Sequence, residues 1–357
     1  MKIALTYDDI TLIPEFSKIK SRKDVDLRTL VSRRYGLLKP LIASPMDTVC
    51  EEEMAFKMFL LGGVGCIHRF MPIEKSIDIL RSLRYRINGN CFSEAFEEWG
   101  ILNDDWHSEI RDIPIMVAIG VQEEDKIIAP LLVEAGANIL VIDVAHGHHI
   151  NVINMITWCK RHLPDHIDII AGNIATRQAA IDLQEAGADG LRVGIGAGSL
   201  CTTRKMTGFG IPMVTCLEDI LSVAKVPVIA DGGIRTSGDI SKALGIGAST
   251  VMLGSLLAGT DEAPGKIIET SNGLVKRYRG SASLETKITH NQEERNIEGE
   301  STIIPYKGGV KFVINGLIDG LKSALSYGGA SSLNEFKPKY IQITNSGILE
   351  AAPHLLK

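Results

Sequence analysis

The sequence predicts an α/β protein built as a single (β/α)8 barrel, the TIM-barrel architecture, over residues 1–357. Eight short apolar runs recur along the chain, and most are followed by a helix-like stretch. The 35 glycines and the low aromatic content of 5% are typical of α/β proteins with many tight turns. No GxGxxG motif follows the first run, which argues against a doubly wound sheet.

The eight apolar runs are the predicted barrel strands. Most of their residues are apolar without a polar alternation, as expected of strands that are covered on both faces. Most end at or next to Gly, Asp, Asn or Ser. They lie at residues 41–44, 63–67, 115–118, 139–143, 169–173, 190–194, 228–231 and 250–254.

Three of the helix-like stretches end in similar sequences directly before a strand. Residues 134–137 and 185–188 both read Glu-Ala-Gly-Ala, and residues 245–248 read Gly-Ile-Gly-Ala. A glycine at the end of a helix, followed by a buried strand, is typical of a repeated βα unit. This internal repeat supports the barrel.

Two segments do not fit a bare barrel. Residues 84–112 are interpreted as a short polar insertion after the second βα unit, too short for a regulatory domain. Residues 276–312 have mixed charge and poor periodicity, which predicts a mobile flap over an active site. The charged run at residues 23–34 is interpreted as a solvated face.

Composition excludes several classes of protein. The net charge of -5 argues against a nucleic-acid partner, which needs a clustered basic face. No apolar run approaches the roughly 18 residues of a membrane span, and the N-terminus carries charges where a signal peptide is apolar. The six cysteines form no CxxC pair, which favours a reducing compartment. We therefore expect a cytoplasmic protein without a membrane partner.

The most informative segment is the glycine-rich loop at residues 194–204. Glycines at alternate positions let backbone N–H groups approach an anion, or backbone carbonyls approach a cation. Cys201 lies in this loop, two residues before Thr203 and three before Arg204. Because neighbouring positive charge activates a thiol, we interpret Cys201 as a nucleophile, although a buried structural cysteine is the commoner role.

Polar residues also follow the other predicted strands, at the barrel end where active sites are built. Asp231 begins an Asp-Gly-Gly sequence after the seventh strand, and Gly254 and Ser255 follow the eighth, where barrels commonly bind phosphate. A carboxylate repels phosphate, so we assign Asp231 to sugar hydroxyls; the alternative is a simple turn. The residues expected at this face are Ser44, Met46, Asp143, Asn173, the 194–204 loop, Asp231 and Ser255.

Three histidines at positions 146, 148 and 149 follow Asp143. They suggest a metal site, but Asp143 is the only nearby carboxylate. We expect Asp143 to accept hydrogen bonds from a ligand instead.

Several motifs occur here in the order typical of the IMP dehydrogenase / GMP reductase family, which the chain resembles over nearly its whole length. The glycine-rich cysteine loop, followed by Asp-Gly-Gly, is the most specific. The motifs are Leu5–Asp9, Ala43–Val49, Ala171–Asn173, Gly194–Arg204, Asp231–Gly233, Tyr278–Ser281, Glu298–Gly299 and Pro305–Gly308.

The resemblance implies that Cys201 attacks C2 of a purine nucleotide to form a thioimidate, with Thr203 and Glu298 handling a proton. It implies NAD(H) or NADP(H) as cofactor, facing Asp143 and Asn173, and a homotetramer. It implies a potassium ion or another monovalent cation on the carbonyls of Gly196, Gly198 and Cys201. The implied substrate-binding residues are Ser44, Met46, Ser199, Asp231, Gly233, Gly254, Ser255, Tyr278 and Gly280.

The sequence favours GMP reductase over a short IMP dehydrogenase without CBS domains. The dehydrogenases have an Arg-Tyr pair on the flap that activates water, and residues 282–297 contain no such pair; Asn follows Arg295. The missing regulatory insertion favours the reductase weakly. Residues 45–48 and 347–354 resemble the dehydrogenase, so this alternative stays open.

Two interpretations from other classes also remain. One is a different barrel enzyme, such as a flavin-dependent oxidoreductase with a phosphorylated substrate. The other is a catalytically silent nucleotide-binding homologue, against which the intact Cys201, Thr203 and Glu298 argue.

Overall fold

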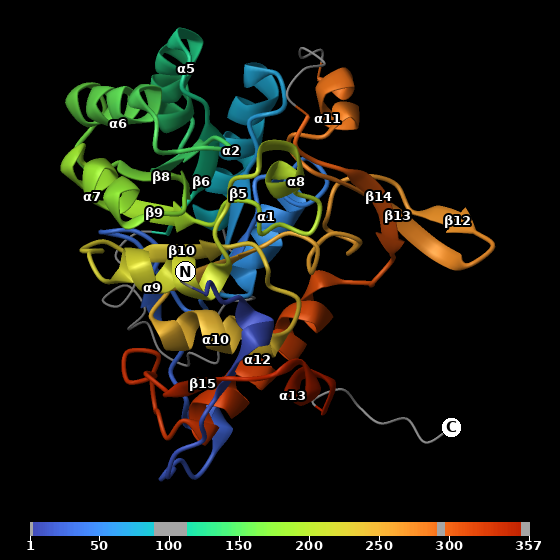
Figure 1. Ribbon diagram of the computed structural model, residues 1–357. Coiled ribbons are helices and arrows are strands. Elements are labelled where there is room, and N and C mark those ends of the chain that lie inside the picture. Colours follow the sequence, from blue (N-terminus) through green and yellow to red (C-terminus); the bar gives the residue numbers. More distant parts are fainter. Residues whose placement is uncertain (1–2, 89–112, 291–296, 351–357) are drawn as a thin grey trace.

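The barrel is present in the computed structural model, which describes residues 3–88, 113–290 and 297–350 (Figure 1). Its eight parallel strands follow one another in chain order, and β11 closes the barrel by pairing with β4. All eight predicted strands are confirmed to within two residues at each end. They are β4 (Leu41–Ala43), β5 (Val64–Ile67), β6 (Met116–Ile119), β7 (Ile139–Asp143), β8 (Asp168–Ile174), β9 (Gly190–Val193), β10 (Val228–Asp231) and β11 (Thr250–Leu253).

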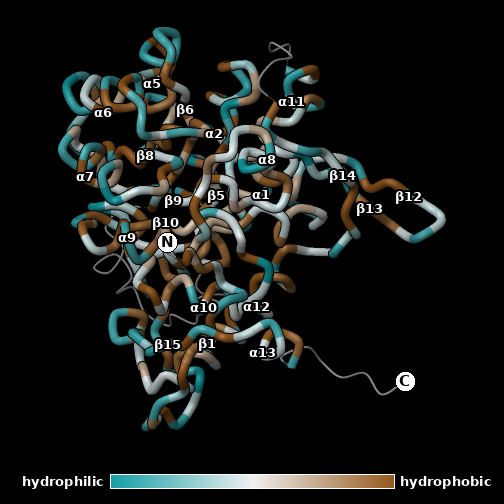
Figure 2. Tube along the Cα trace, viewed as in Figure 1, coloured by the Kyte–Doolittle hydropathy of each residue, from teal (hydrophilic) through white to brown (hydrophobic). Residues whose placement is uncertain are grey.

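Helices on the outside cover the strands. Figure 2 shows hydrophilic residues on the outer turns of α5, α6 and α7, and the strands behind them are completely or almost completely buried. The helices of the barrel are α1 (Glu52–Leu60), α2 (Ile73–Asn88), α5 (Glu123–Glu134), α6 (Ile150–His162), α7 (Arg177–Glu185), α9 (Met213–Leu221), α10 (Ser237–Ile246) and α12 (Val310–Tyr327). A short helix, α8 (Thr203–Thr207), precedes α9.

The repeated glycine sequences end helices, as predicted. Gly136, Gly187 and Gly247 have φ angles of 119°, 106° and 124° just after α5, α7 and α10. Only glycine adopts this left-handed region without a Cβ penalty, so it reverses the chain into the next strand.

The interior of the barrel is a packed apolar core. A hairpin closes the barrel at the N-terminal ends of its strands. The hairpin consists of β2 (Thr29–Leu30) and β3 (Gly36–Leu37), and Val31, Tyr35 and Leu37 pack against strand residues such as Met116. The charged residues Lys23, Asp24, Arg28, Arg33 and Arg34 are exposed, in agreement with the interpretation of residues 23–34 as a solvated face, whereas Val31 and Ser32 are buried. Arg34 Nη1 lies 2.6 Å from Oδ1 of Asp168, whose side chain is fully buried.

The chain ends add smaller elements beside the barrel. Near the N-terminus are the 3-10 turns η1 (Tyr7–Asp9) and η2 (Arg22–Asp24), and strand β1 (Ile10–Leu12). Strand β1 pairs antiparallel with β15 (Tyr340–Gln342), which α13 (Asn345–Glu350) follows. No helix in the described part of the chain is long and apolar enough to cross a membrane.

The segment predicted as a flap, residues 276–312, contributes to an antiparallel sheet that begins earlier, at Ile268, and extends away from the barrel (Figure 1). The sheet consists of β12 (Ile268–Thr270), β13 (Gly273–Arg279) and β14 (Ser301–Pro305), with α11 (Leu284–Thr289) inserted between β13 and β14. Helical periodicity is poor here because the described part of the segment alternates between short strands, turns and the six-residue helix α11. The predicted end at residue 312 is too late, because α12 begins at Val310.

The predicted insertion at residues 84–112 also begins too early. Residues 84–88 form the end of α2, whose buried Leu83 and Ile87 face the core. The rest of the insertion, residues 89–112, lies outside the described residues.

Candidate active site

The glycine-rich loop after β9 places Cys201 at the surface. Gly194 has a φ angle of 139°, and a Cβ there would lie 2.0 Å from the carbonyl oxygen of Asp231. No residue with a side chain fits that position, so the loop crosses directly over the end of β10. Cys201 itself is exposed.

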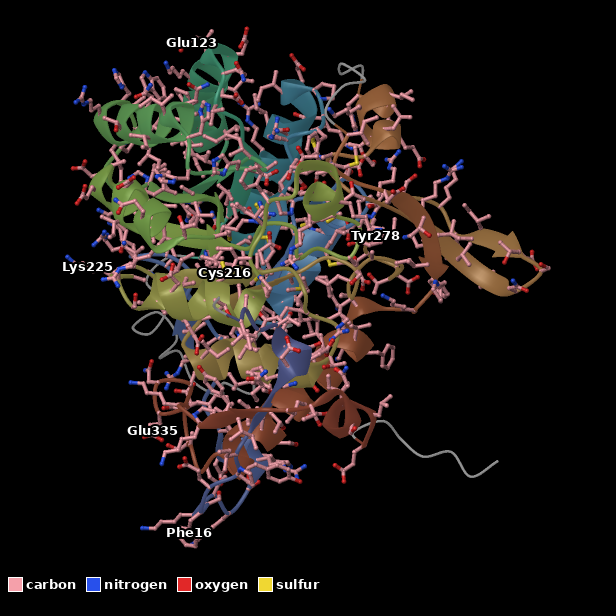
Figure 3. The ribbon with its side chains drawn as sticks, in the orientation of Figure 1. Phe16, Glu123, Cys216, Lys225, Tyr278 and Glu335 are labelled. Carbon is pink, nitrogen blue, oxygen red and sulfur yellow. The ribbon has the colours of Figure 1, made fainter. Side chains whose placement is uncertain are left out.

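The exposure of Cys201 separates it from the other described cysteines. Cys50, Cys66, Cys159 and Cys216 are all buried; Cys216 on α9 is labelled in Figure 3. Burial raises the pKa of Cys159 and of Cys216 to about 12, so both thiols stay protonated. Cys91 lies outside the described residues. Among the described thiols, Cys201 alone is open to a substrate.

Cys201, Thr203 and Glu298 form a hydrogen-bonded chain, although Glu298 is distant in sequence. The Cys201 Sγ lies 3.1 Å from the Thr203 Oγ1, and that hydroxyl donates to Glu298 Oε2 over 2.7 Å. This arrangement can move a proton between the thiol, the hydroxyl and the carboxylate. Arg204, which the sequence places beside the thiol, instead donates to the carbonyl of Ile211 over 2.9 Å.

Backbone pairing holds Glu298 in this position. The Thr202 N–H donates to the Glu298 carbonyl over 3.0 Å, and the Glu300 N–H donates to the Leu200 carbonyl over 2.9 Å. Cys201 and Gly299 thereby form an antiparallel bridge. The cysteine loop and the segment before β14 therefore behave as a two-stranded ribbon, which fixes the carboxylate relative to the thiol.

A second group of predicted residues converges beside the cysteine loop. Tyr278 (labelled in Figure 3) lies on β13, and its hydroxyl is 3.2 Å from the Ser199 Oγ. A Cβ on Gly254 would lie 2.9 Å from that tyrosine hydroxyl, 3.4 Å from the Met46 sulfur and 3.7 Å from the Ser44 hydroxyl. Loops after β4, β9 and β11 therefore meet the flap sheet at Tyr278. A tyrosine hydroxyl is protonated at neutral pH and can donate a hydrogen bond, and burial raises the pKa of Tyr278 further.

The remaining predicted substrate-binding residues lie in the loops around this group. Gly233 has a φ angle of 75°, and a Cβ there would be 3.3 Å from the ring of Tyr7. The Gly280 N–H donates to the Glu300 carbonyl over 2.9 Å. The carbonyl of Ser255 accepts from the Lys307 Nζ over 2.5 Å.

Arg192, on β9, is a site residue that the sequence reasoning missed. Its guanidinium forms ion pairs with Asp143 and, over 2.9 Å, with Asp231. Burial acts to lower the pKa of Arg192, but the two carboxylates outweigh burial and raise it. A charged residue inside an otherwise apolar strand was the available signal.

Asn173 completes this network. Its Nδ2 donates to Asp231 Oδ2 over 2.7 Å and to the carbonyl of Gly194 over 2.8 Å. The two residues predicted to face the cofactor, Asp143 and Asn173, therefore connect to the predicted sugar ligand Asp231 through one buried cluster.

The histidines after Asp143 have other partners. His148 Nε2 lies 2.7 Å from Asp182 Oδ2, and the His149 ring accepts from the Asn151 N–H at the start of α6. The described residues contain no group of three or more His, Cys, Asp or Glu side chains that could hold a metal ion. These contacts agree with the expectation that Asp143 serves another purpose.

The predicted cation ligands lie on the tightest part of the cysteine loop. Gly196 has a φ angle of 73°, and the Gly198 carbonyl accepts from the Cys201 N–H over 3.1 Å. Within the described chain, no backbone N–H donates to the carbonyls of Gly196 or Cys201. Carbonyl oxygens that accept no backbone hydrogen bond are suitable ligands for a monovalent cation, so Gly196 and Cys201 fit one, whereas the Gly198 carbonyl already has a donor.

Comparisons with known proteins agree with this geometry. The IMP dehydrogenase / GMP reductase domain model matches residues 4–354. The chain is 38% identical to inosine-5'-monophosphate dehydrogenase of Cryptosporidium parvum, covering 98% of this chain and 94% of that protein. It is 33% identical to GMP reductase of Leishmania donovani, covering 98% and 96%.

One solved structure is similar to this chain in both fold and sequence. The Trypanosoma brucei GMP reductase, determined as a cysteine-to-alanine variant in complex with guanosine 5'-monophosphate, superimposes with a TM-score of 0.90. Sequence identity is 31%, over 100% of this chain and 99% of that chain. The chain therefore belongs to the IMP dehydrogenase / GMP reductase family, whose members are NAD(P)-dependent oxidoreductases acting on purine nucleotides.

Proposed function

We propose that this protein is a GMP reductase, which converts GMP and NADPH to IMP, ammonia and NADP. The observation that carries the proposal is the exposed Cys201 thiol hydrogen-bonded through Thr203 to Glu298, with no Arg-Tyr pair between residues 282 and 297. A thiol can displace ammonia with this proton relay alone, whereas hydrolysis of a thioimidate also needs an activated water.

In the first half of the reaction, the Cys201 proton moves through Thr203 to Glu298. The thiolate attacks C2 of GMP and the C2–N2 bond breaks. The amine leaves as ammonia after it takes the proton back from Glu298 through Thr203. NADPH then supplies a hydride to C2, the C2–S bond breaks, and IMP is released while Cys201 regains a proton from solvent.

The surrounding residues bind the reactants. We assign the nucleotide to Ser44, Met46, Ser199, Gly233, Gly254, Ser255, Tyr278 and Gly280, and the ribose hydroxyls to Asp231. Both protein hydrogen bonds to Asp231 reach Oδ2, so Oδ1 is the oxygen assigned to the ribose. Asp143 and Asn173 would face the nicotinamide.

The same proposal includes a monovalent cation and an assembly. Potassium would bind the carbonyls of Gly196, Gly198 and Cys201 and keep the cysteine loop in its active shape. We also propose a homotetramer, as the family resemblance implies, and a cytoplasmic location, as the cysteine pattern and the polar N-terminus predict.

The alternative is an IMP dehydrogenase that oxidises IMP to XMP with NAD. The length of the chain does not distinguish a GMP reductase from an IMP dehydrogenase. The alignment with the Leishmania donovani GMP reductase runs over 474 positions, far more than the 357 residues here, whereas that with the Cryptosporidium parvum dehydrogenase runs over 388. Long reductases and short dehydrogenases therefore both exist. The missing insertion, taken above as weak support for the reductase, carries no weight.

An assay that crosses GMP and IMP with both cofactors tests the proposal. We expect NADPH oxidation that depends on GMP, with one ammonia released per turnover. NAD reduction by IMP, without GMP-dependent loss of NADPH, would establish the dehydrogenase instead. Nucleotide binding without turnover in any combination would identify a silent homologue, and a yellow purified protein would indicate a flavin enzyme.

A further inference from the structure

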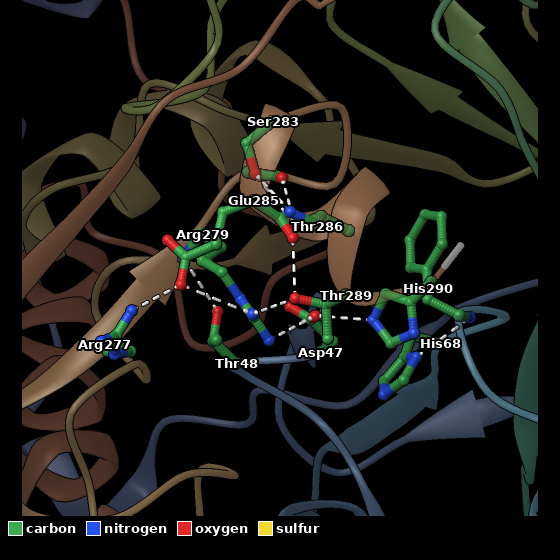
Figure 4. A network of polar contacts seen from close by, with 12 residues as sticks. Asp47, Thr48, His68, Arg277, Arg279, Ser283, Glu285, Thr286, Thr289 and His290 are labelled. Carbon is green, nitrogen blue, oxygen red and sulfur yellow. Dashed lines mark hydrogen bonds and ion pairs between the residues drawn. The ribbon is translucent and has the colours of Figure 1, made fainter. Parts of the chain in front are cut away.

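A buried carboxylate outside the proposed reacting centre joins two parts of the nucleotide site (Figure 4). Asp47 lies in the loop after β4, three residues beyond Ser44 and next to Met46. Its Oδ2 accepts from Arg279 Nη2 over 2.7 Å and lies 3.0 Å from His290 Nε2. Both partners come from the segment that runs from the end of β13 to residue 290.

The position of Arg279 makes this contact relevant to the site. Arg279 ends β13 and lies between Tyr278 and Gly280, two of the proposed nucleotide-binding residues. Its backbone N–H donates to the Thr48 hydroxyl over 3.1 Å, next to Asp47. The main chain and the side chain of Arg279 thus both dock on the loop after β4.

The other side of Arg279 faces α11. Its Nη1 donates to the Thr289 hydroxyl over 3.0 Å and lies 3.6 Å from Glu285 Oε1. Glu285 also pairs with Arg277 over 2.6 Å. Asp47 therefore makes the closest ion pair of Arg279, and Glu285 divides its charge between two arginines.

Asp47 acts through its partners rather than on a ligand. Its side chain is 5% exposed, and that of Arg279 is 16% exposed, so the pair is largely shielded from water. Shielded opposite charges attract strongly, and removing one of them leaves the other buried without compensation. Loss of the Asp47 charge is therefore expected to release β13 and α11 from the loop after β4.

We propose that Asp47 is a positioning residue for nucleotide binding. It holds Arg279, and through it Tyr278 and Gly280, against the loop that carries Ser44 and Met46. This inference rests on the proposed nucleotide site. It adds that the affinity for the nucleotide depends on an ion pair that the nucleotide does not touch.

The variant Asp47→Asn tests this role, because it keeps the shape and removes the charge. Glu51→Gln is the matched control. Glu51 lies in the same loop and also contacts a histidine and a cation, His68 over 3.1 Å and Lys75 over 2.8 Å. Its partners are the residue directly after β5 and a residue of α2 rather than residues of the flap sheet.

Three measurements are made on both variants and the wild type: equilibrium binding of GMP and IMP, steady-state kinetics, and amide hydrogen exchange at residues 278–290. For Asp47→Asn we expect nucleotide affinity to fall about tenfold, kcat at saturating nucleotide to stay within about threefold, and exchange to accelerate. For Glu51→Gln we expect wild-type affinity and wild-type exchange at these residues.

The outcomes separate this inference from the proposed function. Wild-type affinity in Asp47→Asn, or an equal loss in Glu51→Gln, overturns the positioning role while leaving the reductase proposal intact. A wild type that binds neither nucleotide overturns both. A reduced affinity in Asp47→Asn with IMP dehydrogenase activity in the wild type supports the positioning role and overturns only the direction of the reaction.

Discussion

At the scale of single residues, the site depends on contacts between groups that are far apart in the chain. Thr203 is the link between Cys201 and Glu298, because its hydroxyl contacts both. Arg192 is the link between Asp143 and Asp231. Thr203 and Arg192 each contact two other side chains, so a single substitution at either residue removes two contacts.

Replacement of Cys201 tests the covalent step. Cys201→Ala removes the nucleophile from an exposed position, so turnover should fall below detection while the melting temperature changes by less than about 1 °C. Kinetics and thermal unfolding measure these two quantities. Mass spectrometry of wild-type protein quenched during turnover should show a nucleotide adduct that the variant lacks. Retained turnover in the variant excludes the thioimidate.

Replacement of Arg192 tests the buried cluster. Arg192→Met leaves Asp143 and Asp231 facing each other without a countercharge, which should lower the free energy of unfolding by about 3–5 kcal/mol. Arg192→Lys restores the charge but not the forked geometry, so it should recover part of the stability and less of the activity. Urea unfolding and the KM values for nucleotide and cofactor measure these effects.

A suitable control for Arg192 is Arg34, which pairs with buried Asp168 at the opposite end of the barrel. Arg34→Met should lower stability without changing either KM. Equal effects of the two methionine variants on KM would contradict a specific role for the Arg192 cluster.

At the scale of elements, loops after the barrel strands meet a sheet that the chain adds after the eighth strand. The cysteine loop pairs through its backbone with residues 298–300, and the loop after β4 pairs through Asp47 and Thr48 with Arg279. The site is therefore built between the barrel and the flap sheet. Glu51 provides a contrasting connection within the barrel, because it joins the start of α1 to His68, directly after β5, and to Lys75 on α2.

The Glu51 connection predicts a pH dependence of stability. Burial acts to raise the pKa of Glu51, but the contacts with His68 and Lys75 outweigh it and lower the pKa from 4.5 to about 2. Because the folded state favours the ionised form, the stabilisation is complete above the unfolded pKa of 4.5 and is lost as the pH falls toward 2.

We therefore expect Glu51→Gln to lower the melting temperature by about 2–4 °C at pH 7. The difference from the wild type should narrow below pH 4.5. Thermal unfolding between pH 7 and pH 3 measures it. Glu124→Gln, at an exposed position on α5, should show no difference at any pH. If the difference in melting temperature between Glu51→Gln and the wild type widened on acidification, this would contradict the assigned ion pairs.

At the scale of the whole molecule, the barrel could be predicted closely because its signal is local. Continuous apolar runs and glycines at helix ends report burial on both faces and chain reversal, and each needs only neighbouring residues. The family resemblance rests on local motifs in the same way. The hairpin of β2 and β3, which closes the barrel at the N-terminal ends of its strands, was missed because each of its strands has only two residues and its buried residues contact strands that are distant in sequence.

The sequence by itself determined the fold class, the family and the identity of Cys201 as the candidate nucleophile, since strand patterns and motif order are properties of the chain. The family resemblance also grouped Cys201 with Thr203 and Glu298, but only the tertiary structure gave the contacts between them. It placed the Thr203 hydroxyl between the thiol and the carboxylate, and it connected Arg192 to two carboxylates and Asp47 to Arg279, which the sequence analysis did not group. Ion pairs and hydrogen bonds of this kind act over a few ångströms in space between residues far apart in sequence, so no local pattern encodes them.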